Sequence, residues 1–141
     1  MLRPTALLLA MALPMLASAP ATAQSTDDLA VQFGAITFSF YCTTCHGDGA
    51  TGDGSAASTL AVHPTDLTQL SSSNGGAFPE ARVRQSIDGR QEVVGHVEVA
   101  MPPWGRLFSY ELSAFEEGTI RNALISRRID HIIAYLKSIQ K

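Results

Sequence analysis

Cysteine is scarce in this sequence of 141 residues, which contains only Cys42 and Cys45. Two cysteines exclude a framework of several disulfides and leave few soft ligands for a structural zinc ion, which usually has four. Lysine and arginine form no run, and the formal net charge is -3, which argues against nucleic acid as a partner. Val/Ile-rich segments typical of parallel strands are also lacking. We therefore expect an all-α protein with a site built around the two cysteines.

The first 23 residues have the pattern of a secretory signal peptide. Arg3 supplies a positive charge, residues 6–13 form an apolar core, and Ala21-Thr22-Ala23 is an A-x-A cleavage site. An uncleaved membrane anchor is the alternative, although the apolar core is shorter than the roughly 20 residues that a span requires. No later stretch is apolar for long enough to span a bilayer. We expect residues 1–23 to be removed on export.

Cleavage would leave residues 24–141, which are 118 residues (141 − 23) and fit one domain. Because the removed segment carries only one charge, that of Arg3, the net charge of -3 would become −4 (−3 − 1). The sequence shows no internal repeat. We therefore predict a single domain that is exported to a bacterial periplasm.

Both cysteines belong to the segment Cys42-Thr43-Thr44-Cys45-His46, a C-x-x-C-H motif typical of covalent haem attachment. Two thiols at this spacing can each form a thioether to one edge of a porphyrin. The histidine that follows is then placed to ligate the iron through its imidazole. We predict that Cys42 and Cys45 bind one haem c covalently and that His46 is an axial ligand of its iron.

A C-x-x-C pair has three other interpretations: a thioredoxin-like redox pair, half of a zinc site, and a structural disulfide. The redox pair needs a βαβ frame, which the sequence does not indicate. The zinc site would need other ligands, and the available histidines lack zinc-knuckle spacing: His63, His96 and His131. The histidine directly after the second cysteine favours haem over these alternatives.

The second axial position of a haem iron has a strong candidate in Met101. Every other methionine falls within the predicted signal peptide, so Met101 is the only one of the mature chain. Pro102-Pro103 stiffens the backbone after it, and a thioether ligand raises the reduction potential relative to a second histidine. A methionine can also fill a gap in a core, and His63 and His96 are the other candidate ligands. We predict that Met101 ligates the iron.

Apolar residues at helical spacing predict a first helix that is capped by Ser25 or Thr26 and runs into Cys42. The glycine-rich segment 47–54 follows it, and we expect a tight loop whose backbone passes close to a flat, bulky group. The apolar residues of the first helix are Leu29, Phe33, Ile36 and Phe40.

Two further helices are predicted with clear boundaries. One begins with Pro79 in its first turn, buries Val83 and Ile87, and ends at Gly89. The last helix is capped by Ser126 and has an apolar stripe of Ile129, Ile132, Ile133, Leu136 and Ile139. Between these two helices we expect a loop that carries Met101 through Gly105. A helix capped by Ser113 is expected to follow and to be interrupted by Gly118.

These features resemble a class I monohaem cytochrome c, and the resemblance covers nearly all of residues 24–141. Family members carry C-x-x-C-H near the N-terminus and a distal methionine, often in M-P-x-W, which Met101 through Trp104 matches. They also place a glycine eight residues and an aromatic four residues before the first cysteine, here Gly34 and Phe38. Their last helix resembles residues 132–136, which include Tyr135.

The resemblance implies a cytochrome c-like fold, in which short helices and loops wrap around one covalently bound haem. Gly34 would let the first and last helices cross closely, with Phe38 and Tyr135 packed at the crossing. The implied function is electron transfer rather than enzymatic catalysis, by a free carrier or by the cytochrome subunit of a dehydrogenase or respiratory complex. A haem-based sensor or a catalytic haem protein with an open sixth position is the alternative.

The same resemblance implies redox partners, a donor dehydrogenase and an acceptor oxidase or reductase, met by a monomer or in a transient complex. It also implies that the carbonyl of Pro64 accepts a hydrogen bond from His46 and that Arg90 and Trp104 contact the haem propionates. The segment 107–124 departs from the compact family pattern. We expect it to be an extra segment that covers a haem edge or forms a partner surface.

Overall fold

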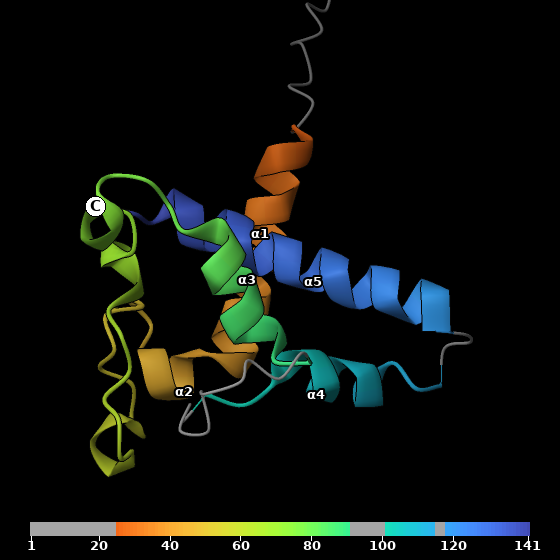
Figure 1. Cartoon of the computed structure of the whole chain (residues 1–141), viewed down its shortest axis with the longest axis horizontal. Coiled ribbons are helices and arrows are strands. Elements are labelled where there is room, and N and C mark those ends of the chain that lie inside the picture. Colours follow the sequence, from red (N-terminus) through yellow and green to blue (C-terminus); the bar gives the residue numbers. More distant parts are fainter. Residues whose placement is uncertain (1–24, 91–100, 115–117) are drawn as a thin grey trace, which may run out of the picture.

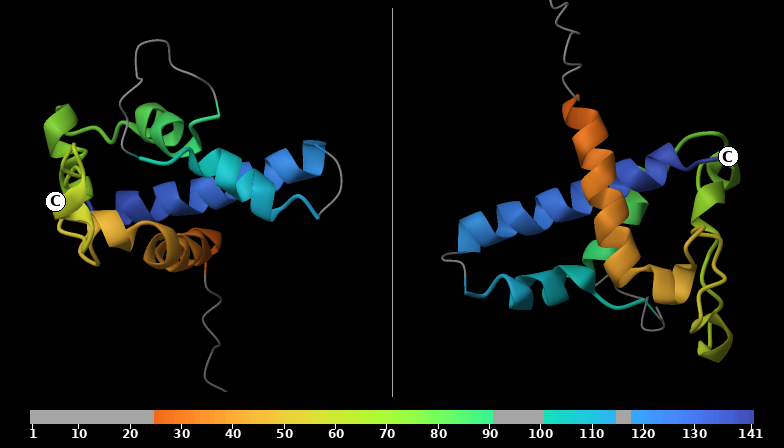
Figure 2. Two further views of the ribbon diagram at one scale, coloured as in Figure 1. Left: turned by 90° about the horizontal axis from the view of Figure 1, so that it is seen from below. Right: turned by 180° about the vertical axis from the view of Figure 1, so that it is seen from behind.

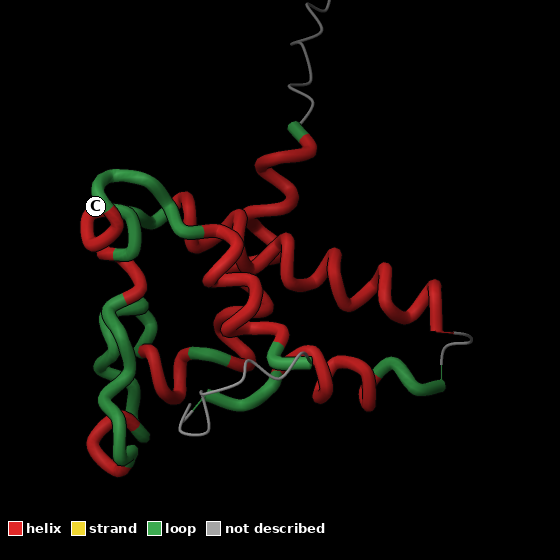
Figure 3. Tube along the Cα trace, viewed as in Figure 1, coloured by secondary structure: helices red, strands yellow, loops and turns green. Residues whose placement is uncertain are grey.

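The computed structural model of the chain describes residues 25–90, 101–114 and 118–141. Over these residues the protein is all-α, as predicted, and Figures 1 and 3 show helices joined by loops without a strand. The α-helices are α1 (Thr26–Tyr41), α2 (Thr43–His46), α3 (Glu80–Asp88), α4 (Trp104–Glu111) and α5 (Gly118–Ser138). Short 3₁₀ turns occupy Ala57–Thr59, Leu67–Gln69 and Ser72–Asn74. The predicted signal peptide and His96 lie outside the described residues.

Helix α1 starts as the sequence predicts. The hydroxyl of Ser25 accepts a hydrogen bond from the backbone N–H of Asp28 at 3.1 Å, and the Asp28 carboxylate accepts one from the Ser25 N–H at 3.4 Å. This reciprocal capping box satisfies two N–H groups that a helix end otherwise leaves unpaired. Among the described helices, none has the length and apolar character needed to cross a membrane.

Helices α1 and α5 cross steeply at the centre of the molecule (Figure 1). Gly34 is buried at the crossing and lies so close to the backbone carbonyl of His131 that any Cβ on it would overlap the oxygen. One turn further along α1, the ring of Phe38 packs 5.2 Å from that of Tyr135. The expected crossing of the first and last helices at Gly34 is therefore present in the fold.

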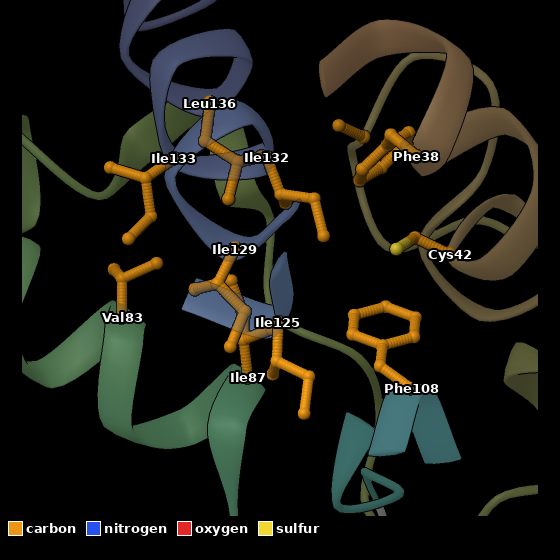
Figure 4. Packing of buried hydrophobic residues seen from close by; sticks show 11 residues of the cluster. Phe38, Cys42, Val83, Ile87, Phe108, Ile125, Ile129, Ile132, Ile133 and Leu136 are labelled. Atoms are coloured by element: carbon orange, nitrogen blue, oxygen red, sulfur yellow. The ribbon is translucent and has the colours of Figure 1, made fainter. Parts of the chain in front are cut away.

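The core surrounds helix α5 (Figure 4). Helix α1 lies on one side of α5, and α3 and α4 lie on the other (Figure 2, left). Each buried side chain of the α5 stripe is at most 3% exposed, and Val83, Ile87 and Phe108 pack against the stripe from α3 and α4. The stripe consists of Ile125, Ile129, Ile132, Ile133 and Leu136.

Two predicted helix starts are wrong. Helix α5 begins at Gly118, so Ser126 lies inside the helix and is not its cap. Gly118 was expected to interrupt a separate helix capped by Ser113, whose first turn falls on residues 115–117, outside the described residues. Helix α3 begins at Glu80, with Pro79 as its N-cap instead of in its first turn. The C-terminal end of α3 is as predicted, because Gly89 takes the left-handed conformation that ends a helix.

Helix α4 was not predicted, because the two prolines before it indicated a loop. Pro103 is instead its N-cap, a place where a proline disturbs no hydrogen bond of the helix. Phe108 is completely buried, and its ring lies 5.4 Å from Tyr41 and 6.0 Å from Trp104. The expected extra segment, 107–124, thus consists in its described part of most of α4, the turn after it and the start of α5.

Replacing Phe38 with alanine is expected to lower the free energy of unfolding by roughly 3–5 kcal/mol, because the ring is 2% exposed and lies at the helix crossing. The measurement is urea denaturation of the purified protein in dilute solution. Phe40→Ala is the matched control, since Phe40 lies two residues further along α1, is 78% exposed, and should change stability by no more than about 0.5 kcal/mol. A loss below about 1 kcal/mol in Phe38→Ala would show that the crossing does not depend on this ring.

Candidate functional site

The single turn α2 carries Cys45 and His46 directly after α1. Residues 47–56 fold back over this turn, and their N–H groups donate to its carbonyl oxygens. A helix of one turn leaves its carbonyls without intrahelical partners, so these bonds hold its geometry. Gly47 donates to Thr43 at 2.8 Å, and Gly52 donates to His46 at 2.9 Å. Gly54 donates to Cys45 at 3.2 Å, and Ala56 donates to Thr44 at 2.9 Å.

The glycine-rich loop packs against the chain's own backbone. A Cβ on Gly54 would lie 2.5 Å from the carbonyl carbon of Cys45 and 2.6 Å from the carbonyl oxygen of Thr43. The prediction that segment 47–54 passes close to a flat, bulky group is therefore wrong at Gly54, since its close neighbour is α2. The loop therefore holds the C-x-x-C-H turn in place through hydrogen bonds and close packing with its backbone.

His46 is held through its Nδ1 atom, which lies 3.2 Å from the carbonyl oxygen of Thr65. The predicted acceptor, the carbonyl of Pro64, is wrong by one residue, because that oxygen lies 3.0 Å from Nδ1 of His63. Burial lowers the pKa of His46, while the Thr65 carbonyl opposes the shift. The imidazole is therefore neutral near pH 7, with Nδ1–H donating to Thr65 and a lone pair on Nε2.

The segment that carries the Thr65 carbonyl is tied to the end of α5. The side chain of Gln140 donates to the Leu67 carbonyl and accepts from the Ser71 N–H, both at 2.8 Å. The N–H of Lys141 donates to the carbonyl of Thr68 at 3.0 Å. These bonds fix the segment against the C-terminal helix.

A cavity of about 490 Å³ brings His46 together with Cys42, Cys45 and Met101. Its volume falls within the range of about 300–1,000 Å³ that is typical of small-molecule and cofactor sites. The lining also comes from α1, the segment 60–70, α3 and α5, and it is predominantly apolar. Of the other predicted site residues, His63, Pro64 and Trp104 line the same cavity.

Met101 lines this cavity, and the chain directly after it is held by contacts with α1 and α3. Gly89 at the end of α3 packs on Pro103, where a Cβ on the glycine would lie 2.7 Å from the proline Cβ. Trp104, which starts α4, has its ring 5.4 Å from that of Tyr41 at the end of α1. Contacts with α1 and α3 thus position the chain immediately after Met101.

Neither cysteine forms a disulfide, so the structural-disulfide interpretation has no support here. Burial, together with the neighbouring Cys45, raises the pKa of Cys42 to about 12. Thiol–disulfide exchange requires a thiolate, and a thiol with so high a pKa forms none near neutral pH. The observed environment of Cys42 therefore disfavours the thioredoxin-like interpretation.

The zinc interpretation is not supported by the described part of the chain. There, no cluster of three or more histidine, cysteine, aspartate or glutamate side chains could hold a metal ion. His131 lies at the crossing of α1 and α5, with its ring stacked 5.5 Å from that of Phe33. His131 does not line the cavity that contains the cysteines, so it is not placed to share a zinc ion with them.

Arg90 does not line the cavity, contrary to the expected contact with a propionate. Its guanidinium donates to both carboxylate oxygens of Asp88, at 2.5 and 2.9 Å, and to the side-chain oxygen of Asn122 at 2.8 Å. Arg82 and Ser86, one turn apart on α3, line the cavity instead. Sequence reasoning did not single them out, although their positions next to the buried Val83 and Ile87 could have indicated them.

Comparisons with known proteins find no match, whether to a family model, to a curated protein or to a solved structure.

Proposed function

We propose that this chain is a class I monohaem cytochrome c that binds one haem in the cavity and passes single electrons between redox proteins of a bacterial periplasm. The observation that carries the proposal is the shared cavity of Cys42, Cys45, His46 and Met101. Met101 lies 55 residues (101 − 46) from His46, so local sequence alone does not bring these side chains together. The cavity supplies two thiols, an imidazole and a thioether to one ligand.

Each residue has a distinct role in this proposal. Cys42 and Cys45 would hold the haem through thioethers, each S–H adding across the C=C bond of a vinyl group, and His46 would bind the iron through Nε2, because Thr65 engages Nδ1. The hydrogen bond to Thr65 fixes the tautomer and makes the imidazole a stronger ligand. Met101 would offer its thioether sulfur to the same iron. When bound, the haem provides a one-electron Fe(II)/Fe(III) couple, whose potential a histidine–methionine pair raises relative to two histidines.

The remaining lining separates an apolar interior from a polar margin. Buried side chains such as Phe38 and Leu136 give the inner wall of the cavity an apolar surface. Arg82 and Ser86 are both exposed, and they offer a cation and a hydroxyl for the propionates in place of Arg90. Trp104 also lines the cavity, where it would contact a propionate.

The proposed protein is an electron carrier, or the cytochrome subunit of a dehydrogenase or respiratory complex, and not itself an enzyme. A dehydrogenase would donate electrons to it, and an oxidase or reductase would accept them. Export by a cleaved signal peptide, residues 1–23, places it in the periplasm.

Optical spectra test the proposal directly. The protein exported in cells that attach haem is expected to show sharp c-type bands when reduced, and carbon monoxide should leave them unchanged because Met101 occupies the sixth position. Met101→Ala should convert the iron to a high-spin form that binds carbon monoxide, with a lower reduction potential. Leu60→Ala is the control, since Leu60 lines the same cavity without a ligating atom.

Two outcomes would overturn parts of the proposal. A protein that carries no haem after export with a working attachment system would rule out the cofactor. A wild-type spectrum that shifts under carbon monoxide would favour a haem-based sensor or catalytic haem protein with an open sixth position.

A further inference from the structure

Helix α1 carries an apolar stripe that remains partly exposed, although the ring of Phe33 stacks on that of His131 from α5. Leu29, Phe33, Ile36 and Phe40 are 38%, 53%, 53% and 78% exposed. Successive spacings of four, three and four residues place them on one face of the helix, at the a and d spacing of a helix–helix seam. The residues of α1 that face the core, Gly34 and Phe38, lie on another face.

The position of α1 makes this face accessible. Seen from behind, α1 lies in front of α5 (Figure 2, right), and α3 and α4 lie beyond α5 (Figure 2, left). The cavity residues of α1, Phe38 and Tyr41, turn toward the rest of the molecule. A second helix could therefore lie along the stripe without blocking the cavity.

We propose that the stripe pairs with the α1 stripe of a second copy of this chain, with the two helices antiparallel, in a reversible dimer. The four–three–four spacing reads the same in both directions. An antiparallel two-fold pairing therefore sets Leu29 against Phe40 of the second copy and Phe33 against Ile36, so every apolar position meets another. A self-complementary patch of this kind is what a two-fold dimer requires.

Charge favours the antiparallel direction. Asp27 and Asp28 lie in the first turn of α1, and no charged residue follows them up to Tyr41. A parallel pair would bring four carboxylates together at one end, whereas an antiparallel pair keeps the two sets at opposite ends. The antiparallel pair also sets each helix dipole against the opposite one.

The available area fits a weak dimer. With roughly 200 Å² for a phenylalanine side chain, Phe33 and Phe40 at 53% and 78% exposure offer about 260 Å² per copy. Leu29 and Ile36 bring the exposed apolar area of the stripe to roughly 400 Å², or about 800 Å² for two copies. The rim residues Gln32 and Ser39, which are exposed, bring this close to the roughly 1,000 Å² of the smallest biological interfaces. We therefore expect reversible association and not a permanent dimer.

Sedimentation velocity of the exported protein, from micromolar to millimolar concentration, tests the proposal. The sedimentation coefficient should rise with concentration from that of a monomer to that of a dimer. Phe40→Ser should raise the dimer Kd by about thirtyfold, because a two-fold interface loses the contact twice. Tyr110→Ser is the control and should leave the Kd unchanged, since Tyr110 is 81% exposed on α4, away from the stripe.

A charge exchange tests the direction of pairing. Leu29→Lys and Phe40→Glu should each weaken the dimer, and the double variant should recover much of the loss, because each introduced charge then faces its opposite on the second copy. In a parallel pair like charges would meet, and the double variant would be weaker than either single variant. All variants alter exposed side chains, and unchanged circular dichroism will confirm that they fold.

Three results would overturn the inference. They are a monomer at every concentration, a dimer that Phe40→Ser does not weaken, and a double variant without recovery. Binding of monomers to phosphatidylcholine vesicles that requires Phe40 would assign the stripe to a lipid surface instead. The inference concerns α1 alone and does not depend on which group the cavity binds.

Discussion

Gly34→Val should lower the free energy of unfolding by about 3 kcal/mol or more, or prevent folding altogether. A Cβ at this position overlaps the backbone carbonyl oxygen of His131 and lies 2.8 Å from the Cβ of Tyr135. Neither a carbonyl within a helix nor a Cβ can rotate away, so α1 and α5 must separate. Separation would also pull Phe38 from Tyr135, whose rings now lie 5.2 Å apart.

Urea denaturation followed by circular dichroism measures this effect. Gly34→Ala should show a smaller loss in the same direction, because it adds the Cβ without the two further methyl groups. The control is Gly118→Ala at the start of α5, where nothing lies within 4 Å of an added Cβ. That variant should be neutral or slightly more stable, since alanine favours a helix over glycine. A Gly34→Val protein within about 1 kcal/mol of the wild type would show that the crossing can widen freely.

The double variant Cys42→Ala, Cys45→Ala should lose haem and, with it, most of its tertiary structure. Without a bound group, the cavity of about 490 Å³ would remain within a small core. Its apolar lining would then be exposed to water, which costs free energy in proportion to the apolar area, and a typical domain has only about 5–15 kcal/mol of stability in total. The chain must therefore collapse into the cavity or unfold.

Far-ultraviolet and near-ultraviolet circular dichroism of the double variant measure the loss. Thr44→Ala is the matched control, because Thr44 is exposed between the two cysteines and its replacement leaves both thiols in place. It should keep the spectrum of the wild type. A native-like spectrum and a cooperative urea transition in the haem-free double variant would show that the fold does not depend on the bound group.

The helices that the sequence predicted well are those whose apolar spacing is repeated over several turns. The capped start of α1, the glycine end of α3 and the isoleucine stripe of α5 all belong to this class. Helix α4 was not predicted because proline was read as a residue that breaks helices, whereas Pro103 is the N-cap of α4. The start of α5 was misplaced for a similar reason, because glycine was read as a residue that interrupts helices, whereas Gly118 begins α5. The two residues occupy helix starts, where their backbone preferences do no harm.

The residues of the candidate site were also predicted correctly in part and wrongly in part. The motif at residues 42–46, and Met101 as the one methionine outside the predicted signal peptide, indicated the four principal residues, and all four line the cavity. The partner of His46 was misplaced by one residue, because a loop has no periodicity that fixes which carbonyl faces inward. Arg90 was expected to contact a propionate, but its guanidinium binds the carboxylate of Asp88, which is only two residues away in the sequence.

The crossing of α1 and α5 also has a consequence for the timing of folding. It joins residues around 34 to residues around 131, so a chain that is translocated N-terminus first carries α1 for a long interval before its packing partner arrives. Long-range contacts of this kind form late, because the intervening chain must first be ordered. During that interval Cys42, which the finished fold buries to 9% exposure, remains accessible to whatever modifies it covalently. In the proposed export, α5 would be the last helix to emerge, and its packing on α1 would end the period in which the thiols can react.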